Sequence, residues 1–474
     1  MLAYLQHVAR RHDLYKDMIF ETGLTGAQWD ASSQRWNVQT STGVNFSTRY
    51  LVTSLGLLSK QNFPDIPGIH DFQGEKYHTG AWPADVKLEG KRVGVIGNGS
   101  TGVQVITDIA KRVKHLISFQ RNPQFSVPSG QGPVSKEYRD RINADYQQIW
   151  KEVKDESSFG FGFNETSRPT FSVSPEEREE IFEKAWKTGG GFRFMFETFG
   201  DISVNEDANN AAADFIKRKI RETVHDQEKA RKLLPTQLYA RRPLCDAGYY
   251  EQFNRENVDI VSLNDTPIDH ITEKGVQTFD GVEHEVDMLI FATGFDAVDG
   301  NYTRLAIQGV DGQTLKEHWS DGPTSYLGIA VPKFPNMFMI LGPNGPFCNI
   351  PPAIETHVEV ISDMIASAEK GDRLVNDNAV ENSRSRHDSF VNARGEGPSK
   401  CPVIEATAEA EQDWTRVCDE ASASSLFRKT DSWIFGSNVP GKAHAVMFYF
   451  GGLSTYRKKL REIAADGWRG FTMK

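Results

Sequence analysis

The chain has 474 residues, of which 38% are hydrophobic and 25% are charged, and its formal net charge is −10 at pH 7. This composition is ordinary for a soluble globular protein of about three domains, and the negative charge argues against nucleic acid as the main partner. No run of about 18 apolar residues occurs, so we expect no membrane span. The four cysteines form no CxxC pair and no zinc-type cluster, and we expect reduced thiols, no metal site and a cytoplasmic protein.

Two regions, Met18–Gly56 and Val258–Gly294, share one order of expected elements. Each begins with a short strand, continues with two β runs around a turn signal, and closes on an apolar run that stops at a glycine. We interpret them as two copies of one structural unit, although two unrelated hairpins would give a similar pattern. The terminal glycines, Gly56 and Gly294, would let the backbone lie close to a cofactor; a tight strand end is the alternative reading.

Between these regions lies a strand–turn–helix–strand pattern. Arg92–Ile96 is expected to be a buried strand, Ser100–Val113 a helix and Leu116–Phe119 the next strand. The turn has the order G-x-G-x-x-G, which lets the backbone approach a pyrophosphate at the helix N-terminus. A purely structural glycine turn is the alternative. The expected cofactor contacts are Gly97, Asn98, Gly99, Ser100, Thr101, Gly102 and Gln104.

The end of the second strand of this unit indicates which nucleotide binds. A free ribose calls for Asp or Glu about 20 residues after the glycines, but this chain has Gln120, Arg121 and Asn122 there. An arginine can hold a 2′-phosphate that a carboxylate would repel. The sequence therefore predicts NADPH, with Arg121 and Asn122 at its phosphate; a solvated surface arginine is the alternative.

Three further segments carry candidate site residues. Arg241 and Arg242 are adjacent, so their side chains point in opposite directions if the segment is extended. One could then reach a nucleotide phosphate and the other a reaction centre. A pair of solvated surface arginines is the alternative. Asn344 and Gly345 lie in a GPNGP turn that would suit a flat ligand over backbone N–H groups. Trp433 lies in a Gly/Pro-rich loop, where a lid residue and a core residue are equally good readings.

The predicted fold class is α/β, with two Rossmann-like dinucleotide-binding domains, the first one incomplete, and a helical insertion. No βαβ unit precedes the first repeat in this sequence, so we expect the chain to start inside its first domain. The expected divisions are 1–57 (remnant of an FAD-binding domain), 58–90 (linker), 91–133 and 235–297 (NADP-binding domain), 134–234 (helical insertion) and 298–474 (C-terminal part of the FAD-binding domain, with a polar surface insert at 370–402).

The segment Asp71–Pro83 has no apolar periodicity and is expected to be a loop or a joint. Its Phe72, Gly74, His78 and Trp82-Pro83 follow the order F-x-G-x-x-x-H-x-x-x-W-P just before the second nucleotide-binding unit. This order resembles the signature of the Baeyer–Villiger monooxygenases. The segments GVIGNGSTGVQVIT, RPLCDAGYY, ATGFDAVDGNY and MFMILGPNGPF are similar to the same family, in particular to its cyclohexanone monooxygenases.

The resemblance implies FAD and NADP as cofactors, and O2 and a ketone, expected to be cyclic, as reactants that give an ester or lactone. It implies that Arg242 is the active-site arginine, which stabilises negative charge on the reacting oxygens. By the same resemblance Arg241 and Arg121 contact phosphate, and Trp433 contacts the nicotinamide nucleotide. His78 would act through its position in a hinge between domains rather than by proton transfer.

Two other functions stay open at this point. An N- or S-oxidising flavin monooxygenase would share the two nucleotide folds, but the Trp82-Pro83 ending and Arg242 speak against it. A non-catalytic remnant that binds only NADP would explain why the sequence lacks a first G-x-G-x-x-G turn. The oligomeric state is open.

Overall fold

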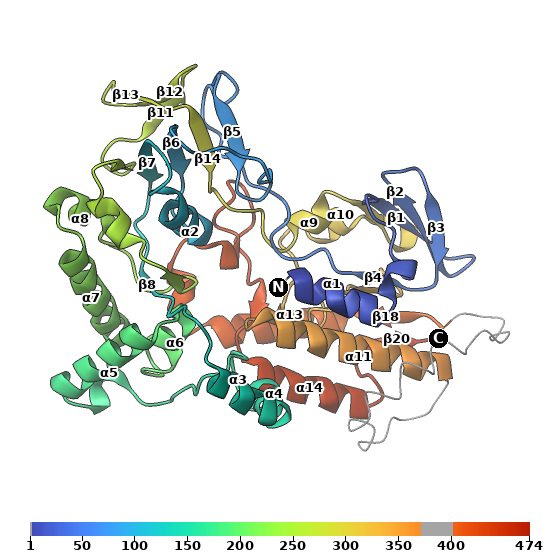
Figure 1. The fold of residues 1–474 in the computed structure, drawn as a ribbon. Coiled ribbons are helices and arrows are strands. Elements are labelled where there is room, and N and C mark those ends of the chain that lie inside the picture. The colour runs from blue at the N-terminus through green and yellow to red at the C-terminus, as the bar shows by residue number, and fades with distance from the viewer. Residues whose placement is uncertain (1, 371–401) are drawn as a thin grey trace.

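A five-stranded parallel sheet forms the centre of one half of the molecule (Figure 1). The computed structural model describes residues 2–370 and 402–474, so most of the predicted insert at 370–402 lies outside the described residues. The strand order is β10-β7-β6-β14-β5, and every neighbouring pair is parallel. The bounds are β5 Glu75–His78, β6 Arg92–Ile96, β7 His115–Gln120, β10 Val258–Ser262 and β14 Met288–Phe291.

Helix α2, Ser100–Ile109, connects β6 to β7 and completes the predicted βαβ unit. The helix ends four residues earlier than its apolar pattern predicts. Val93 and Val95 of β6 are fully buried, as expected for a strand covered on both faces. The predicted dinucleotide-binding unit is therefore present, with the glycine turn at its first strand end.

Strand β5 lies inside the segment expected to be a linker and carries part of the signature. It forms an edge of the sheet by pairing with β14, with His78 opposite Phe291. The expectation of a loop is wrong here, because parallel pairing at a sheet edge satisfies the backbone of a segment whose own pattern is weak. Phe72 is buried, and a Cβ on Gly74 would lie 2.4 Å from its ring, so both signature residues pack tightly.

The repeated meander and its closing strand are confirmed, but the short strand expected at the start of each copy forms only in the second copy, as β10. Strands β1 (Leu24–Asp30), β2 (Arg35–Thr40) and β3 (Asn45–Thr48) form one antiparallel meander, and β11 (Ile268–Ile271), β12 (Gly275–Thr278) and β13 (Glu283–Glu285) form the other. Strand β4, Leu51–Thr53, pairs in parallel with β16, Met337–Met339, and takes the place that β14 has in the second copy. Residues 18–23, where the first copy was expected to begin with a strand, contain none, and the first strand of that copy is β1 at Leu24.

Region 134–234 is helical, as predicted, but its helices divide between two neighbours. Helix α4 packs on α14, whereas α6 packs on β8 and β9, and Phe182, Phe194 and Phe215 join the core beneath the five-stranded sheet. The helices are α3 Lys136–Ala144, α4 Tyr146–Asp155, α5 Pro175–Thr188, α6 Gly191–Phe196, α7 Glu206–Thr223 and α8 Gln227–Leu233. The insertion thus touches both halves of the molecule (Figure 1).

Three helices, α11 (Ile350–Lys370), α13 (Ala408–Ser422) and α14 (Leu453–Ala465), build the core of the C-terminal half together with Phe338 and Tyr449. The remaining elements are short. They are α1 Leu2–Arg11, β8 Ser126–Pro128, β9 Leu244–Asp246, α9 Gly300–Thr303, β15 Ala306–Gln308, α10 Leu315–His318, β17 Gly345–Pro346, β18 Ile404–Ala406, β19 Phe448–Tyr449 and β20 Phe471–Met473.

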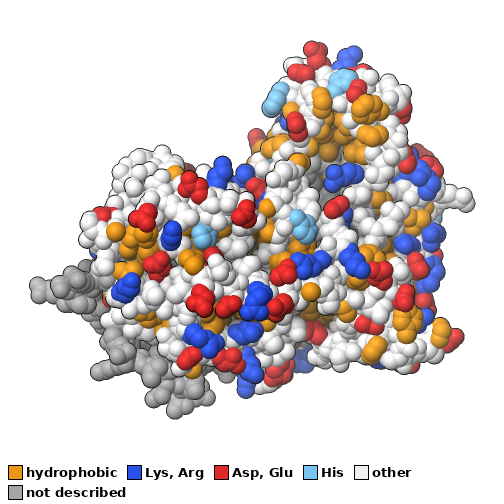
Figure 2. Space-filling model, turned by 180° about the vertical axis from the view of Figure 1, so that it is seen from behind, with side chains coloured by type: hydrophobic (Ala, Val, Ile, Leu, Met, Phe, Trp, Pro, Cys, Tyr) orange, Lys and Arg blue, Asp and Glu red, His pale blue; other side chains and the backbone are white. Residues whose placement is uncertain are grey.

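Across residues 2–370 and 402–474, no helix is both long and apolar enough to cross a membrane, and no three His, Cys, Asp or Glu residues gather as metal ligands. Cys245, Cys348 and Cys418 are free thiols. Figure 2 shows basic and acidic side chains mixed over the face seen from behind, rather than one broad basic area.

His357 on α11 ties the turn after β16 to α14. Its Nδ1 accepts the Leu341 amide proton at 3.0 Å, and its Nε2 lies 2.9 Å from the Tyr456 hydroxyl, which donates to the Leu327 carbonyl oxygen at 2.5 Å. This chain of hydrogen bonds requires the neutral ring protonated at Nε2. Complete burial lowers the pKa of His357 to about 3.

We therefore expect the free energy of unfolding to fall as the pH drops from about 6.5 toward 3, because only the unfolded chain binds a proton at this histidine. The loss should approach about 1.4 kcal/mol per pH unit. In His357→Asn, which keeps an acceptor for Leu341, urea unfolding at pH 7.5 and 5 should show a pH slope smaller by one proton. His225→Asn, at an exposed position, is the control. An equal slope in both variants would contradict the assignment.

Candidate active site

The glycine turn after β6 is built for close backbone contact. Gly97 has φ 102°, and a Cβ there would lie 2.6 Å from the Ala292 carbonyl oxygen. A Cβ on Gly102 would lie 2.2 Å from the Gly97 carbonyl oxygen, whereas one on Gly99 would meet open space. The first and third glycines are therefore required by packing, and the second leaves the helix N-terminus at Ser100 open to a ligand.

The other residues predicted at this turn have separate surroundings. Asn98 is buried, and its Nδ2 donates to Gln120 Oε1 at 2.9 Å and to the Asn122 carbonyl oxygen at 3.0 Å, so its side chain fixes the turn to the end of β7. Thr101 and Gln104 line a cavity of about 380 Å³ that Trp82 also lines.

Arg121 and Arg241 lie near each other, although 120 positions separate them. Arg121 is exposed at the end of β7. Burial lowers the pKa of Arg241, the carboxylate of Asp431 opposes that shift, and the like charge of Arg121 adds to it. The buried Arg241 Nε has no hydrogen-bond partner among the described residues. Two guanidiniums close enough to influence each other electrostatically suit a phosphate group.

Arg242 lies at the meeting point of the glycine turn and an aromatic wall. Its Nη1 is 3.4 Å from Ser100 Oγ, and its Cζ lies 5.8 Å from the centre of the Phe192 ring. The side chain reaches solvent, although burial by the surrounding protein lowers its pKa, and we call this partly covered position the Arg242 hollow. Within the described residues no carboxylate forms an ion pair with it. A guanidinium placed this way can attract an anion.

Phe192 beside Arg242 belongs to a cluster of phenylalanines, and our sequence reasoning missed most of them. Phe161 lies 4.7 Å from Phe192, and Phe159 stacks on Phe196 at 3.9 Å between ring centres. Phe347 stacks on Phe450 at 4.9 Å. The signal was present as alternate phenylalanines in FGFGF and GFRFMF, but such runs also occur in ordinary cores, so only the fold shows that they meet beside Arg242.

The loop with Trp433 is fastened near Gly294. Trp433 is half-buried and meets Phe448 edge-on at 5.9 Å. Further along the loop, Lys442 forms ion pairs with Asp296 at 2.6 Å and with Asp299. Asn438 Nδ2 donates to the Phe295 carbonyl oxygen at 2.8 Å. The loop therefore closes over the strand end that the sequence assigned to a cofactor.

The two strand-end glycines both have left-handed backbone conformations, and their contact with a cofactor stays a prediction. Gly56 and Gly294 have φ 75° and 81°, and a Cβ on Gly294 would meet nothing within 4 Å. Asn344 and Gly345 differ from the expectation, because their N–H groups already donate to the Met447 and Gly342 carbonyl oxygens at 2.7 and 3.2 Å. They shape the turn but leave no free backbone donors for a ligand. The reason is that this turn packs beneath β19.

His78 occupies a position suited to packing rather than to proton transfer. It is 2% exposed and lies between the rings of Phe63 and Phe295, at 5.0 and 5.5 Å. Burial lowers its pKa, and its Nδ1 accepts the Gly80 amide proton at 3.0 Å. A neutral ring at the end of β5 therefore fixes the start of the segment that leads to β6.

Comparison with known proteins places these features in a family. Residues 1–127 match the model of flavin-binding monooxygenase-like proteins. The chain is 50% identical over 473 residues to a phenazine N-monooxygenase of Lysobacter antibioticus and 49% identical over 468 residues to a cyclohexanone 1,2-monooxygenase of Acinetobacter sp.. These alignments cover 100% and 99% of this chain, and 82% and 81% of the relatives.

A crystal structure of cyclohexanone monooxygenase from Rhodococcus sp. Phi1 bound to NADP+ superposes with a TM-score of 0.92 at 52% identity, over 100% of this chain and 84% of that one. The chain belongs to the Baeyer–Villiger monooxygenase family. Its predicted fold class and its two cofactors, FAD and NADP, are confirmed.

The residues of this Baeyer–Villiger monooxygenase fit the two cofactors to different extents. For NADP, the open Gly99, the start of α2 and the pair Arg121 and Arg241 offer a pyrophosphate turn and a phosphate clamp. For FAD, the open space at Gly294 and the unpaired Arg242 suit the flavin end. No second G-x-G-x-x-G turn for its ADP end occurs in the sequence.

We expect Arg121→Ala to weaken NADP+ binding by about 10- to 100-fold, because a charge-assisted contact of roughly 1.4–2.7 kcal/mol is lost. NAD+, which has no 2′-phosphate, should bind equally to both proteins. Isothermal titration calorimetry measures both affinities. Arg112→Ala, which breaks exposed ion pairs with Glu89 and Asp108 in the same domain, should change neither. Equal loss of NAD+ affinity in Arg121→Ala would show that the arginine does not read the 2′-phosphate.

Proposed function

We propose that this chain catalyses the NADPH- and O2-dependent insertion of one oxygen atom into a ketone, giving an ester or lactone. The observation that carries the proposal is Arg242, a solvent-reachable guanidinium with no carboxylate partner among the described residues, between the glycine turn and a wall of phenylalanines. The inserted atom comes from O2, and the second atom leaves as water with the hydride of NADPH and a proton.

Arg242 has the role of charge stabilisation in this proposal. Attack on a ketone carbonyl places negative charge on the carbonyl oxygen, and a fixed guanidinium beside that oxygen stabilises it. An arginine suits the task because it keeps its proton even where burial lowers its pKa. Bound FAD, reduced by NADPH, supplies the oxygen in an activated form.

The surrounding rings select the substrate and keep water away. Phe161, Phe192, Phe347 and Phe450 present apolar surface, which favours the carbon skeleton of a ketone over a charged molecule. The name of one relative, cyclohexanone 1,2-monooxygenase, supports a cyclic ketone. In our proposal Trp433 and its loop cover the nicotinamide end, and Arg121 with Arg241 holds the 2′-phosphate.

A second candidate, the N-oxidation of a flat heteroaromatic compound, has one observation in its favour. Phe161 and Phe163, next to Phe192, are almost parallel at 8°. In the hydrophobic cluster against which Phe192 packs, Phe435 and Phe450 lie at 7° and Phe347 and Phe450 at 20°. Parallel faces suit stacking with a planar ligand. Another relative carries the name phenazine N-monooxygenase. A nitrogen lone pair would take the same oxygen atom without forming an oxyanion on carbon.

The proposal is tested by incubating the protein with FAD, NADPH, O2 and cyclohexanone and measuring the lactone by gas chromatography. We expect one lactone per NADPH consumed, and a decrease of at least about 100-fold in Arg242→Ala, which corresponds to roughly 3 kcal/mol of lost charge stabilisation. NADP+ binding, measured by calorimetry, separates loss of chemistry from loss of cofactor. Lactone formation that survives the substitution would overturn the role of Arg242.

The two candidate reactions are separated by offering cyclohexanone and phenazine to the same preparation. We expect lactone formation with a kcat/KM at least tenfold above that of N-oxide formation, since only the ketone adduct draws on Arg242. Mass spectrometry detects both products through the gain of one oxygen atom. The opposite ratio would favour the N-oxidising function.

A further inference from the structure

The rings that line one side of the Arg242 hollow belong to a short segment, Phe159–Phe163, whose backbone is fixed elsewhere. The Asn349 amide donates to the Phe159 carbonyl oxygen at 2.8 Å, and Asn349 Nδ2 donates to the Gly160 carbonyl oxygen at 3.0 Å. The Leu453 amide donates to the Ser158 carbonyl oxygen at 2.8 Å. The segment is thus attached to the residue directly before α11 and to the first residue of α14.

The carboxylate of Glu165, just after this segment, binds the residues at its start. Glu165 accepts the amide protons of Ser158 and Phe159, both at 2.7 Å, and the hydroxyl of Ser157 at 2.7 Å. Gly160 has φ 67°, which lets the backbone turn so that the rings face α6. The side chains therefore meet Phe192 and Phe196 in the dinucleotide half, whereas the backbone belongs to the C-terminal half.

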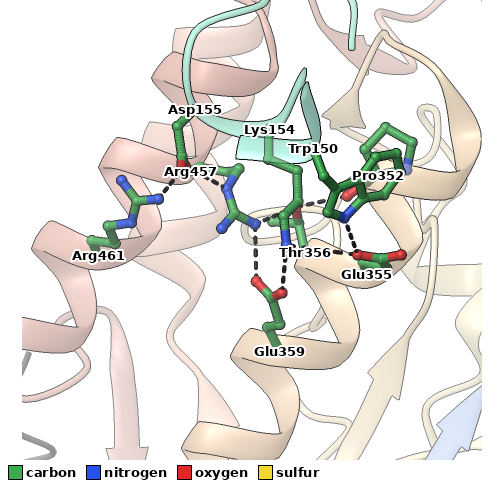
Figure 3. A network of polar contacts seen from close by, with 9 residues as sticks. All are labelled: Trp150, Lys154, Asp155, Pro352, Glu355, Thr356, Glu359, Arg457 and Arg461. Carbon is green, nitrogen blue, oxygen red and sulfur yellow. Dashed lines mark hydrogen bonds and ion pairs between the residues drawn. The ribbon is translucent and has the colours of Figure 1, made fainter. Parts of the chain in front are cut away.

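An ionic network directly before the segment fixes its starting point (Figure 3). Asp155, the last residue of α4, accepts from Arg457 Nε at 3.1 Å and also pairs with Arg461. Arg457 pairs with Glu359 at 3.0 Å and donates to Thr356 Oγ1 at 2.7 Å.

The other helix-to-helix contacts of this network also come from α4. Lys154 pairs with Glu359 at 2.9 Å, and Trp150 Nε1 donates to Glu355 at 2.9 Å. Lys154, Arg457 and Arg461 balance Asp155, Glu355 and Glu359, so the network has no net formal charge. Figure 3 shows these side chains converging from three helices.

The ion pairs of this network hold the helices together firmly because the centre of the network is shielded from water. The Arg457 side chain is 9% exposed, and every carboxylate it contacts comes from another helix. Burial would raise the pKa of Asp155, but Arg461 and Arg457 outweigh it and hold that pKa below its ordinary value. Removing one partner would leave Arg457 buried without its full set of acceptors, which is costly. Three residues lie between Asp155 and Phe159, so the distance between their Cα atoms is at most about 14 Å.

We propose that Asp155 and Arg457 are positioning residues: by holding α4 on α11 and α14 they set where Phe159 and Phe161 meet α6, and so the width of the site beside Arg242. They touch neither cofactor nor substrate. The ordering of the segment stands on the contacts above, and its consequence for the ketone rests on the proposed function.

The first experiment measures the segment directly and needs no activity. In Asp155→Asn we expect amide hydrogen exchange of residues 157–165, followed by mass spectrometry, to become at least tenfold faster, with α7 unchanged. The control is Glu183→Gln, which removes a carboxylate paired with Lys219 in the same insertion but on α5 and α7. Unchanged exchange of residues 157–165 in Asp155→Asn would overturn the proposal.

The second experiment measures the effect of the same substitution on the kinetics with cyclohexanone. In Asp155→Asn we expect the KM for cyclohexanone to rise at least fivefold, with kcat changed less than twofold and the Kd for NADP+ unchanged, because a wider site holds a small ring loosely. Asp155→Glu, which keeps the charge, should recover most of the change, and Glu183→Gln should show none. Faster exchange with an unchanged KM would refute the role in the site, while the ordering role would stand.

Two further outcomes are distinguishable. If the unsubstituted protein gives no lactone, the proposed function fails and the claim about the ketone fails with it, but the exchange experiment still decides whether the network orders the segment. If Asp155→Asn does not fold, Arg461→Gln removes the 58% exposed partner of the same carboxylate. We then expect about threefold faster exchange at residues 157–165, and no change would count against the proposal.

Discussion

Parallel pairing of β6 with β7 and β14 is the constraint on which the candidate site depends. The register sets Ile96 opposite both Phe119 and Phe291, so the three strands end at the same edge of the sheet. The residues that follow them are the glycine turn, Arg121 and Gly294. In parallel sheets this edge is where ligands bind, because loops and helix N-termini gather there and leave backbone N–H groups facing outward. Residues nearly 200 positions apart thereby share one place.

The second half of the site does not belong to that sheet. Phe159 and Phe161 are held by α4, α11 and α14, and they meet Phe192 and Phe196 of α6, which packs on the dinucleotide half. The hollow beside Arg242 therefore has one wall from each half of the molecule. Its shape depends on the relative position of two bodies as much as on the residues in it, which is why contacts far from the reaction centre can influence substrate choice.

The shielded cations at the edges of the site form ion pairs with carboxylates, whereas the cation inside the site has no carboxylate partner among the described residues. Lys442 with Asp296 and Asp299, and Arg457 with Asp155 and Glu359, are shielded cations satisfied by two carboxylates each, and they fasten segments in place. Arg242 is the contrast, since the described residues supply it with a ring face and a hydroxyl but no carboxylate. A cation left in that state favours an anionic partner, as the charge stabilisation assigned to it requires.

The sequence alone determined what depends on neighbours along the chain. The glycine spacing, the strand and helix around it, the repeated meander and the family signature are local patterns, and they led to the fold class, both cofactors and the family. Arg121 could be singled out because a fixed distance separates it from the glycines.

By contrast, β5 was taken for a loop, since an edge strand can draw its stability from the strand beside it rather than from its own residues. The approach of Arg241 to Arg121, the use of the Asn344 and Gly345 amides inside the protein, and the phenylalanine wall are contacts between distant segments. Tertiary structure decided these, because which side chains meet depends on how helices and strands pack, and no local spacing encodes that.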